Sequence, residues 1–271
     1  MYMNSFIFGY AGNKRGELKN IIPILELKKD SIKTVIEPFC GTSCISFNLW
    51  KKYPDLKYIL NDNNKELINL YNIIKYGKIN EFLEEAYRIK DTLTTKELYN
   101  NYVRSKSEHS YFIANKFNSI KPGLYNKNMY NSTLKITKEQ KEFFKFVMSD
   151  NVVISNEDWE DIFNKSDSSQ LYVFDPPYVS TCNSFYSNAS FNVYEYFAEN
   201  SMENMESNIV FVLENNWFIK MLFRDIKNVI KYTKKYVGAR KKISEHIIVC
   251  NYDLNDLISF NTDLINSFER S

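Results

Sequence analysis

Hydrophobic and polar positions follow two alternating patterns along the first part of the chain. Residues Thr34 to Phe39 form a short apolar run that predicts a buried strand, and Cys44 to Tyr53 follows with helical spacing. The pattern then repeats, with a short strand at Tyr58 to Leu60 and apolar residues at helical spacing from Lys65 to Lys75. Such alternation is typical of an α/β protein with a parallel sheet.

The alternation stops after Gly77 and resumes near residue 150. We therefore interpret residues 79–149 as an inserted domain within a main domain made of residues 1–78 and 150–271. The insertion has a polar, aromatic and turn-rich centre from Tyr111 to Leu134. The helices expected around this centre are Glu81 to Lys90, Lys96 to Arg104 and Lys138 to Met148.

The final third of the chain returns to strand and helix patterns. The two last strand-like runs are joined by a basic connection too short for a crossover helix, so we expect them to pair antiparallel. The sequence thus predicts a mostly parallel, doubly wound, Rossmann-like α/β sheet with an antiparallel C-terminal hairpin and a mainly helical insertion. The expected elements are strands at Val152 to Ile154, Leu171 to Phe174, Ile209 to Leu213, Val229 to Thr233 and Glu245 to Tyr252, and a helix around Tyr194 to Met205.

Composition and short sequence patterns indicate the cellular compartment and whether a metal site is expected. The 271 residues are 44% hydrophobic, yet no apolar run approaches the roughly 20 residues of a membrane-spanning helix. The N-terminus lacks the signal-peptide pattern, so we expect a cytoplasmic or nuclear protein. The four cysteines form no Cys-x-x-Cys pair, and neither histidine is spaced to them as a metal ligand, so no metal site is expected.

Two segments concentrate the positive charge of a chain whose formal net charge is only +2. Residues 100–135 contain six Lys or Arg and the single acid Glu108, and residues 227–242 contain seven and no acid. Such segments suit a polyanion such as nucleic acid, although solvated surface lysines are the alternative interpretation. The basic residues are Arg104, Lys106, Lys116, Lys121, Lys127 and Lys135 in the first segment, and Lys227, Lys231, Lys234, Lys235, Arg240, Lys241 and Lys242 in the second.

The end of one predicted strand carries the most informative chemistry. Leu171 to Phe174 runs directly into Asp175-Pro176-Pro177-Tyr178, and ligands of parallel sheets bind beyond the carboxyl ends of strands. An exocyclic amine on a base ring is a poor nucleophile because its lone pair is delocalised. Asp175 and the Pro176 carbonyl can each accept one amine hydrogen and so orient that lone pair, while Tyr178 can stack on a base pulled out of the helix.

Two other strand ends allow a nucleotide ligand or a purely structural role. Gly41, in the turn from Glu37 to Ser43, permits close approach of the backbone to a ligand, but an ordinary strand-to-helix turn is the alternative. Asp62 follows about 20 residues later, where nucleotide-binding sheets use a carboxylate to bind ribose. Asp62 can equally serve as a helix N-cap.

These motifs resemble those of the DNA adenine-N6 methyltransferases that use S-adenosylmethionine, in the branch whose target-recognition insertion precedes Asp-Pro-Pro-Tyr. Near the N-terminus, Tyr10 to Arg15 resembles that branch's Trp-Ala-Gly-Gly-Lys motif, and Asp158-Trp159 resembles the pair that reads the cofactor's adenine. The resemblance implies catalytic roles for Asp175, Pro176 and Tyr178. It implies cofactor contacts for Tyr10, Ala11, Gly12, Lys14, Glu37, Phe39, Gly41, Asp62, Asp158, Trp159 and Asp175, and DNA contacts for Arg104, Lys116, Asn118, Lys121, Tyr125, Asn126 and Lys127.

The implied reaction is a direct methyl transfer to the N6 amine of adenine in duplex DNA, with base flipping and no metal. The chain departs from the family pattern at Asn13, which replaces a glycine, and at Thr42, where a positive φ would strain a β-branched residue. An RNA adenine methyltransferase and a catalytically impaired nucleic-acid-binding relative are therefore the alternatives. Trp50 and Trp217 fall on apolar helical faces and are expected in the core.

Overall fold

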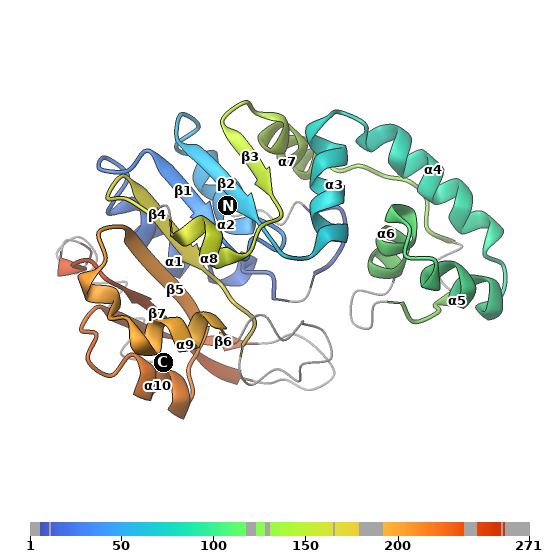
Figure 1. The fold of residues 1–271 in the computed structure, drawn as a ribbon. Helices are drawn as coiled ribbons and strands as arrows, with labels where there is room; N and C mark the ends of the chain where they lie inside the picture. Colours follow the sequence, from blue (N-terminus) through green and yellow to red (C-terminus); the bar gives the residue numbers. More distant parts are fainter. Residues whose placement is uncertain are drawn as a thin grey trace.

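The described part of the chain, in a computed structural model, comprises residues 6–10, 12–117, 123–127, 131–164, 166–178, 192–235, 243–255 and 257. These residues form one seven-stranded sheet with the order β3-β2-β1-β4-β5-β7-β6 (Figure 1). The strands are β1 (Thr34–Glu37), β2 (Lys57–Asn61), β3 (Val152–Ser155), β4 (Gln170–Phe174), β5 (Asn208–Glu214), β6 (Val229–Lys235) and β7 (Ile243–Cys250).

Strands β1 to β5 are parallel to one another, whereas β7 pairs antiparallel with both β5 and β6. The predicted mostly parallel sheet with an antiparallel C-terminal hairpin is therefore confirmed. The carboxyl ends of β1 to β5 meet along one edge. Because His246 is paired with Glu214 of β5 and with Tyr232 of β6, the hairpin brings its own polar side chains to the same edge.

Helices cover both faces of the sheet, because successive residues of its central strands point to opposite sides. Leu171 and Val173 of β4 join one hydrophobic cluster, and Tyr172 and Phe174 join the other. The first cluster contains residues of α1, α2, α3 and α7, and the second contains residues of α8, α9 and α10. The helices are η1 (Arg15–Glu17), α1 (Leu18–Glu26), α2 (Cys44–Trp50), α3 (Lys65–Lys75), α4 (Ile79–Thr92), α5 (Lys96–Arg104), α6 (Glu108–Phe117), α7 (Lys138–Met148), α8 (Trp159–Phe163), α9 (Asn192–Glu199), η5 (Met202–Asn204) and α10 (Trp217–Leu222).

Three of these helices have the boundaries that the sequence predicts, since polar caps determine where they begin. Asn64 accepts a hydrogen bond from the backbone N–H of Leu67 at the start of α3, and Thr95 caps α5 in the same way. Helix α7 begins with a capping box between Thr137 and Gln140. Local side-chain chemistry therefore specifies these starting points without help from the rest of the fold.

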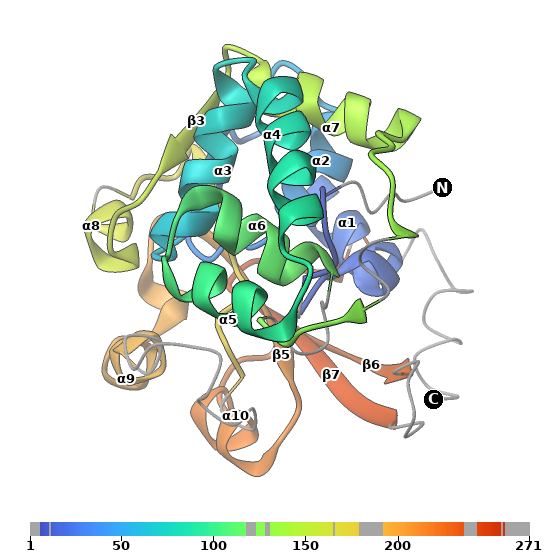
Figure 2. The ribbon, with the colours of Figure 1, turned by 90° about the vertical axis from the view of Figure 1, so that its right-hand side faces the viewer.

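Helices α4, α5 and α6 project beyond the β3 edge of the sheet, and they lie in front of it in the rotated view (Figures 1 and 2). The expectation of a turn-rich segment from Tyr111 onward is wrong for its first part, because Glu108–Phe117 forms α6. Phe112, Ile113 and Ala114 are buried there. The polar residues around them mask this apolar face in the sequence.

Helix α7 packs against α2 and β2 of the sheet core, although its residues fall within the expected insertion. The ring of Phe143 lies 5.4 Å from that of Phe47, and the ring of Phe146 lies 5.8 Å from that of Tyr58. The protruding part of the insertion thus consists of α4, α5 and α6. The division into two domains stays a prediction.

Neither a membrane-spanning helix nor a metal cluster is found in the described ranges. No helix there combines enough length with enough apolar character to cross a bilayer. The same residues include no group of three or more His, Cys, Asp or Glu that could hold a metal ion. Cys40, Cys44 and Cys250 are buried free thiols, as their spacing indicates, and Cys182 lies outside the described residues.

Replacing Phe143 by Ala should lower the free energy of unfolding by about 3–5 kcal/mol, because it leaves a cavity between α7 and the sheet. Urea denaturation measures this change. Met148→Ala on the same helix is the control, since Met148 is an exposed large side chain. Equal stability of the two variants would show that α7 is not part of the main hydrophobic core.

Candidate active site

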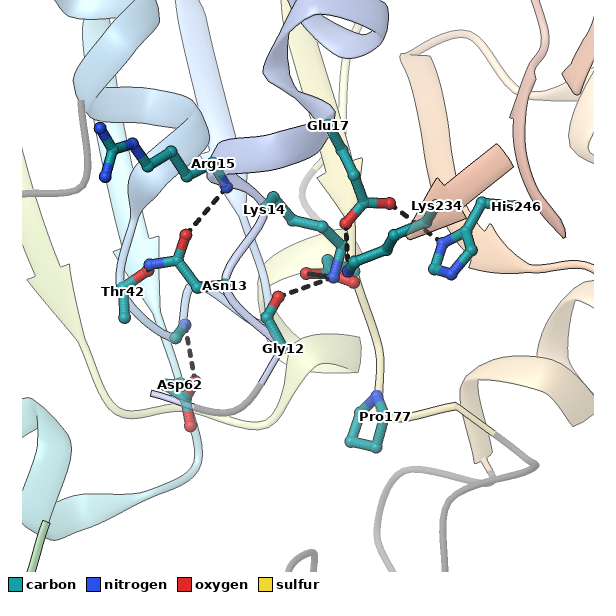
Figure 3. Close-up of polar contacts among 12 residues, drawn as sticks. Gly12, Asn13, Lys14, Arg15, Glu17, Thr42, Asp62, Pro177, Lys234 and His246 are labelled. Carbon is teal, nitrogen blue, oxygen red and sulfur yellow. Dashed lines mark hydrogen bonds and ion pairs between the residues drawn. The ribbon is translucent and has the colours of Figure 1, made fainter. Parts of the chain in front are cut away.

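The two motifs that the sequence analysis places far apart meet at the carboxyl end of β4. The Nζ atom of Lys14 lies 2.6 Å from Oδ2 of Asp175, with 4% and 18% of the two side chains exposed. The same ammonium group donates to the Gly12 carbonyl at 2.9 Å and lies 5.0 Å from the centre of the Tyr178 ring. Lys14 thus joins the N-terminal motif to both polar residues of Asp-Pro-Pro-Tyr, and Figure 3 shows its bond to the Gly12 carbonyl.

Burial and charge act in opposite directions on the carboxylates of this site. Burial raises the pKa of Asp175 above its ordinary value, and the ion pair with Lys14 opposes that rise. Burial also raises the pKa of Glu37 to about 7, and the nearby Asp175 adds to the effect. The backbone N–H of Ser46 donates to Oε1 of Glu37 at 2.8 Å and works against it. Near pH 7 the Glu37 carboxyl group is therefore partly protonated, and it lies close enough to Asp175 to be affected by its charge.

The turn after β1 adopts left-handed backbone at two residues. Gly41 and Ser43 both have a φ of 47°, whereas Thr42 is not among the residues with positive φ. The expected strain at Thr42 is therefore wrong. Ser43 carries the left-handed conformation instead, and its hydroxyl accepts a hydrogen bond from the Tyr71 hydroxyl at 2.9 Å.

Asn13 and Thr42, the two departures from the family pattern, contact each other. The side-chain amide of Asn13 donates to the Thr42 hydroxyl at 3.1 Å, and its Oδ1 accepts from the backbone N–H of Arg15 at 2.8 Å (Figure 3). A glycine at position 13 has no side chain with which to make either bond. The pair fastens the N-terminal motif to the glycine turn.

Asp62 joins the end of β2 to this turn. Its Oδ2 accepts from the backbone N–H of Gly41 at 3.0 Å, and its Oδ1 accepts from Asn64 at 2.9 Å. The N-cap of α3 is Asn64, so the interpretation of Asp62 as that cap is wrong. A carboxylate has about four acceptor positions, which leaves capacity for the two hydroxyls of a ribose. Burial raises the pKa of Asp62, and the two backbone hydrogen bonds oppose it.

Aromatic residues lie beside the glycine turn. A Cβ atom on Gly41 would lie 3.4 Å from Cε1 of Tyr10, so the Tyr10 ring already rests on this turn. Phe39 is half-buried after β1, with its ring 6.3 Å from that of Phe174. Tyr10, Gly12, Lys14, Gly41 and Asp62 therefore lie along the edge formed by the carboxyl ends of β1, β2 and β4, while Ala11 lies outside the described residues.

The expected pair Asp158 and Trp159 is divided between surface and core. Asp158 is exposed at the start of α8, whereas only 5% of the Trp159 residue is exposed. The Trp159 ring packs 5.9 Å from Phe174 and 6.2 Å from Phe197. Its role in reading an adenine stays a prediction, and the packing gives the indole a structural role that the motif does not indicate.

A buried charge cluster that no sequence motif indicates lies directly beside Lys14. Glu17 is 1% exposed, and its carboxylate accepts from Tyr232 at 2.6 Å and from Lys234 at 2.5 Å. The Nδ1 atom of His246 lies 3.0 Å from the same carboxylate (Figure 3). His246 also contacts the Tyr178 ring, with centroids 5.5 Å apart.

The surroundings of Glu17 reverse the effect of its burial. Burial alone raises the pKa, but the hydrogen bond with His246 and the charges of Lys14 and Lys234 lower it to about 2. Glu17 is therefore a fixed negative charge that compensates two buried ammonium groups. The acid three residues after Lys14, together with the predicted pairing of the last two strands, was the available signal for this cluster.

The residues expected to bind DNA divide into exposed and structural ones. Arg104 and Lys127 are exposed. Lys116 instead donates to the Ile7 carbonyl at 2.9 Å, and burial lowers its pKa. Asn126 donates to the Phe117 carbonyl at 3.0 Å, and Tyr125 packs 5.6 Å from the ring of Tyr99. Asn118 and Lys121 lie outside the described residues.

The second basic segment also contributes fewer surface charges than its sequence suggests. Lys227 and Lys231 are exposed, but Lys234 faces inward to Glu17. The side chain of Lys235 and residues 240–242 lie outside the described part of the chain. The polyanion-binding interpretation thus applies to Lys227 and Lys231, and not to Lys234.

The raised pKa of Glu37 predicts a pH-dependent stability. The folded state keeps the Glu37 proton up to about pH 7 and the unfolded state loses it near pH 4.5, so stability falls as pH rises between these values. Glu37→Gln should therefore exceed the wild type in unfolding free energy by up to about 3 kcal/mol at pH 8, and by little at pH 4. Chemical denaturation at both pH values measures the difference.

Glu139→Gln, at an exposed carboxylate, is the control for this experiment and should shift stability equally at both pH values. A constant difference between Glu37→Gln and the wild type across the range would contradict the raised pKa.

Comparison with known proteins relates this geometry to a family. The chain matches the profile of the D12 class N6 adenine-specific DNA methyltransferases over residues 10–237. It is 24% identical over 277 aligned positions to the type II methyltransferase M.MjaIII of Methanocaldococcus jannaschii, covering 90% of this chain and 92% of that protein.

Among solved structures, the human methyltransferase 10 domain containing protein is similar with a TM-score of 0.42 and 10% identity, over 87% of this chain and 82% of that chain. The N-terminal domain of human METTL16 in complex with SAH is similar with a TM-score of 0.39 and 10% identity, over 87% and 68%. The profile match spans the glycine turn, the insertion, Asp-Pro-Pro-Tyr and β6. This chain therefore belongs to the D12 class of N6 adenine-specific DNA methyltransferases, which use S-adenosylmethionine as cofactor.

Proposed function

We propose that this protein transfers a methyl group from S-adenosylmethionine to the N6 amine of adenine at specific sites in duplex DNA. The observation that carries the proposal is the position of Asp175, at a strand end and held by Lys14 at 2.6 Å. The family supports the reaction class, and the geometry supports the roles that we propose for individual residues.

The donor set suits a nucleoside cofactor with a charged tail. Asp62 retains acceptor capacity toward a ribose, and the Gly41 N–H that it binds keeps the glycine turn close to it. Tyr10 offers aromatic surface against the same turn, and Phe39 offers more just before it in the chain. Lys14, whose positive charge lies next to Asp175, would face a carboxylate of the cofactor. When bound, S-adenosylmethionine supplies an electrophilic methyl group.

Asp175 activates the amine by accepting a hydrogen bond from it. Lys14 occupies Oδ2, which leaves Oδ1 available to the substrate, and the Pro176 carbonyl can accept the second amine hydrogen. Two acceptors at these positions turn the nitrogen lone pair out of the ring system. The developing positive charge on the nitrogen is stabilised by the adjacent carboxylate.

Lys14 favours the ionised form of that carboxylate and holds it in place. Burial raises the pKa of Asp175, and Lys14 is the main group that opposes the rise. Glu17 in turn compensates Lys14 and Lys234, so the ammonium groups are not left unbalanced inside the protein. Tyr194 fixes the next residue of the motif by donating to the Pro177 carbonyl at 3.2 Å.

The target base must leave the helix to reach this point. Only 18% of the Asp175 side chain is exposed, and an amine inside a stacked duplex cannot approach both it and the Pro176 carbonyl. Tyr178 lies beside Lys14 and can stack on the flipped base. The exposed Arg104 and Lys127 of the insertion are suited to phosphate contacts.

Asp62→Ala should weaken S-adenosylmethionine binding by about 10- to 100-fold, because it removes charge-assisted hydrogen bonds and releases the Gly41 turn. Isothermal titration calorimetry measures the dissociation constant. Asp158→Ala tests the other acidic candidate in the same way. An unchanged constant in Asp62→Ala would assign Asp62 a purely structural role.

Asp175→Asn should reduce methyl transfer at least about 100-fold, because the amide cannot stabilise the charge on the amine. Nucleoside mass spectrometry for N6-methyladenine, after incubation with A/T-containing duplex DNA, measures the product. Asparagine is preferred to alanine because it keeps a polar partner for the buried Lys14.

Cofactor binding serves as the control and should stay close to that of the wild type, whereas the melting temperature should fall because the buried charge of Lys14 loses its ionic partner. Methylation of RNA oligonucleotides but not of DNA would replace the proposed substrate by RNA, since an RNA enzyme depends on the ribose 2′-hydroxyl. Cofactor binding without transfer to either would favour the impaired relative.

A further inference from the structure

Trp217 lies on the surface, where the sequence analysis expects a core residue. Its residue is 75% exposed, and Met221, one turn later on α10, is 54% exposed. Helix α10 carries two apolar stripes in its sequence. Ile219 and Phe223 form the buried one, and Trp217 and Met221 form the other. The expectation of a buried Trp217 is therefore wrong, because helical periodicity cannot show which stripe faces the sheet.

The exposed tryptophan is connected by two ring contacts to the catalytic motif. The Trp217 ring lies 6.1 Å from that of Phe218, and the Phe218 ring lies 6.1 Å from that of Tyr194. The Tyr194 hydroxyl donates to the Pro177 carbonyl. Helix α10 begins just after the carboxyl end of β5, the strand next to β4. Trp217 thus lies on the same edge of the sheet as Asp175.

Positive charges share the surface of Trp217. Lys220 and Arg224 are exposed and follow Trp217 at spacings of three and seven residues, and Lys227 is exposed after them. Arg224 pairs with Asp225 at 3.3 Å, but both side chains are more than 70% exposed, so the pair is weak. A protein partner covering this surface would bury Lys220 and Lys227, and lysine is depleted in protein interfaces. Nucleic acid combines stacking bases with phosphates, and it suits both residue types.

We infer that the exposed face of α10, formed by Trp217, Lys220 and Met221, binds the substrate DNA next to the target adenine, together with Arg224 just after the helix. Trp217 stacks on an exposed base or sugar, and Lys220 contacts a neighbouring phosphate. This inference rests on the proposed function, since it assigns a second contact surface for the same substrate. It adds a DNA contact from the main domain to those expected from the insertion.

Steady-state kinetics of Trp217→Ala on unmethylated A/T-containing duplex DNA test the inference. The Michaelis constant for DNA should rise by about 5- to 100-fold, the range expected when one stacked aromatic is removed. The turnover number at saturating DNA and the dissociation constant for S-adenosylmethionine should change less than about twofold. Tyr76→Ala is the matched control, because Tyr76 is 74% exposed at the end of α3 and away from the strand ends that hold the site.

Fluorescence gives a readout that does not depend on catalysis. The chain has three tryptophans, of which Trp159 is buried, Trp50 is partly buried and Trp217 is exposed. Saturating duplex DNA should protect the wild type from acrylamide quenching, and Trp217→Phe should lose this protection.

A Michaelis constant equal to that of Tyr76→Ala, or quenching of Trp217 that DNA does not change, would overturn the inference. Protection of Trp217 by DNA in a protein that transfers no methyl group to DNA would instead support this surface and reject the proposed function. The two failures are therefore distinguishable.

Discussion

The ion pair between Lys14 and Asp175 is the constraint on which the rest of the site depends. Both side chains are largely removed from water, so each requires the other, and the chain must bring its N-terminal motif to the end of β4. A single ammonium group then contacts the Gly12 carbonyl, Asp175 and the face of Tyr178. The cost of burying this pair is offset by Glu17, which adds a second negative charge beside Lys14.

The antiparallel hairpin extends the sheet and also positions side chains beside the site. A sixth parallel strand would require a crossover helix. Only the carboxyl end of that strand would then bring side chains to the edge of the sheet that holds the site. The hairpin instead places Tyr232, Lys234 and His246 around Glu17, and it sets His246 against the Tyr178 ring. The positions of residues from three distant parts of the chain therefore depend on one buried carboxylate.

The same edge of the sheet also organises the approach of the substrate. The glycine turn and Asp62 lie at the ends of β1 and β2, Asp175 at the end of β4, and α10 beyond the end of β5. A cofactor and a target base bound on this edge would meet at Asp175. The insertion and α10 extend from different parts of the fold, and under the proposed function both would contact the substrate.

The sequence by itself determined the strands, the bounds of α3, α5 and α7, the antiparallel hairpin and the motifs at the strand ends, because these depend on local periodicity and on short polar patterns. It did not determine α6, the exposure of Trp217, the bond between Asn13 and Thr42, or the Glu17 cluster. Each of these depends on which side chains meet across long sequence separations. Glu17 and His246 are 229 positions apart, and only the pairing of β5, β6 and β7 brings them together. Tertiary structure decided these features because burial and charge compensation are properties of the assembled sheet edge, and no single segment contains them.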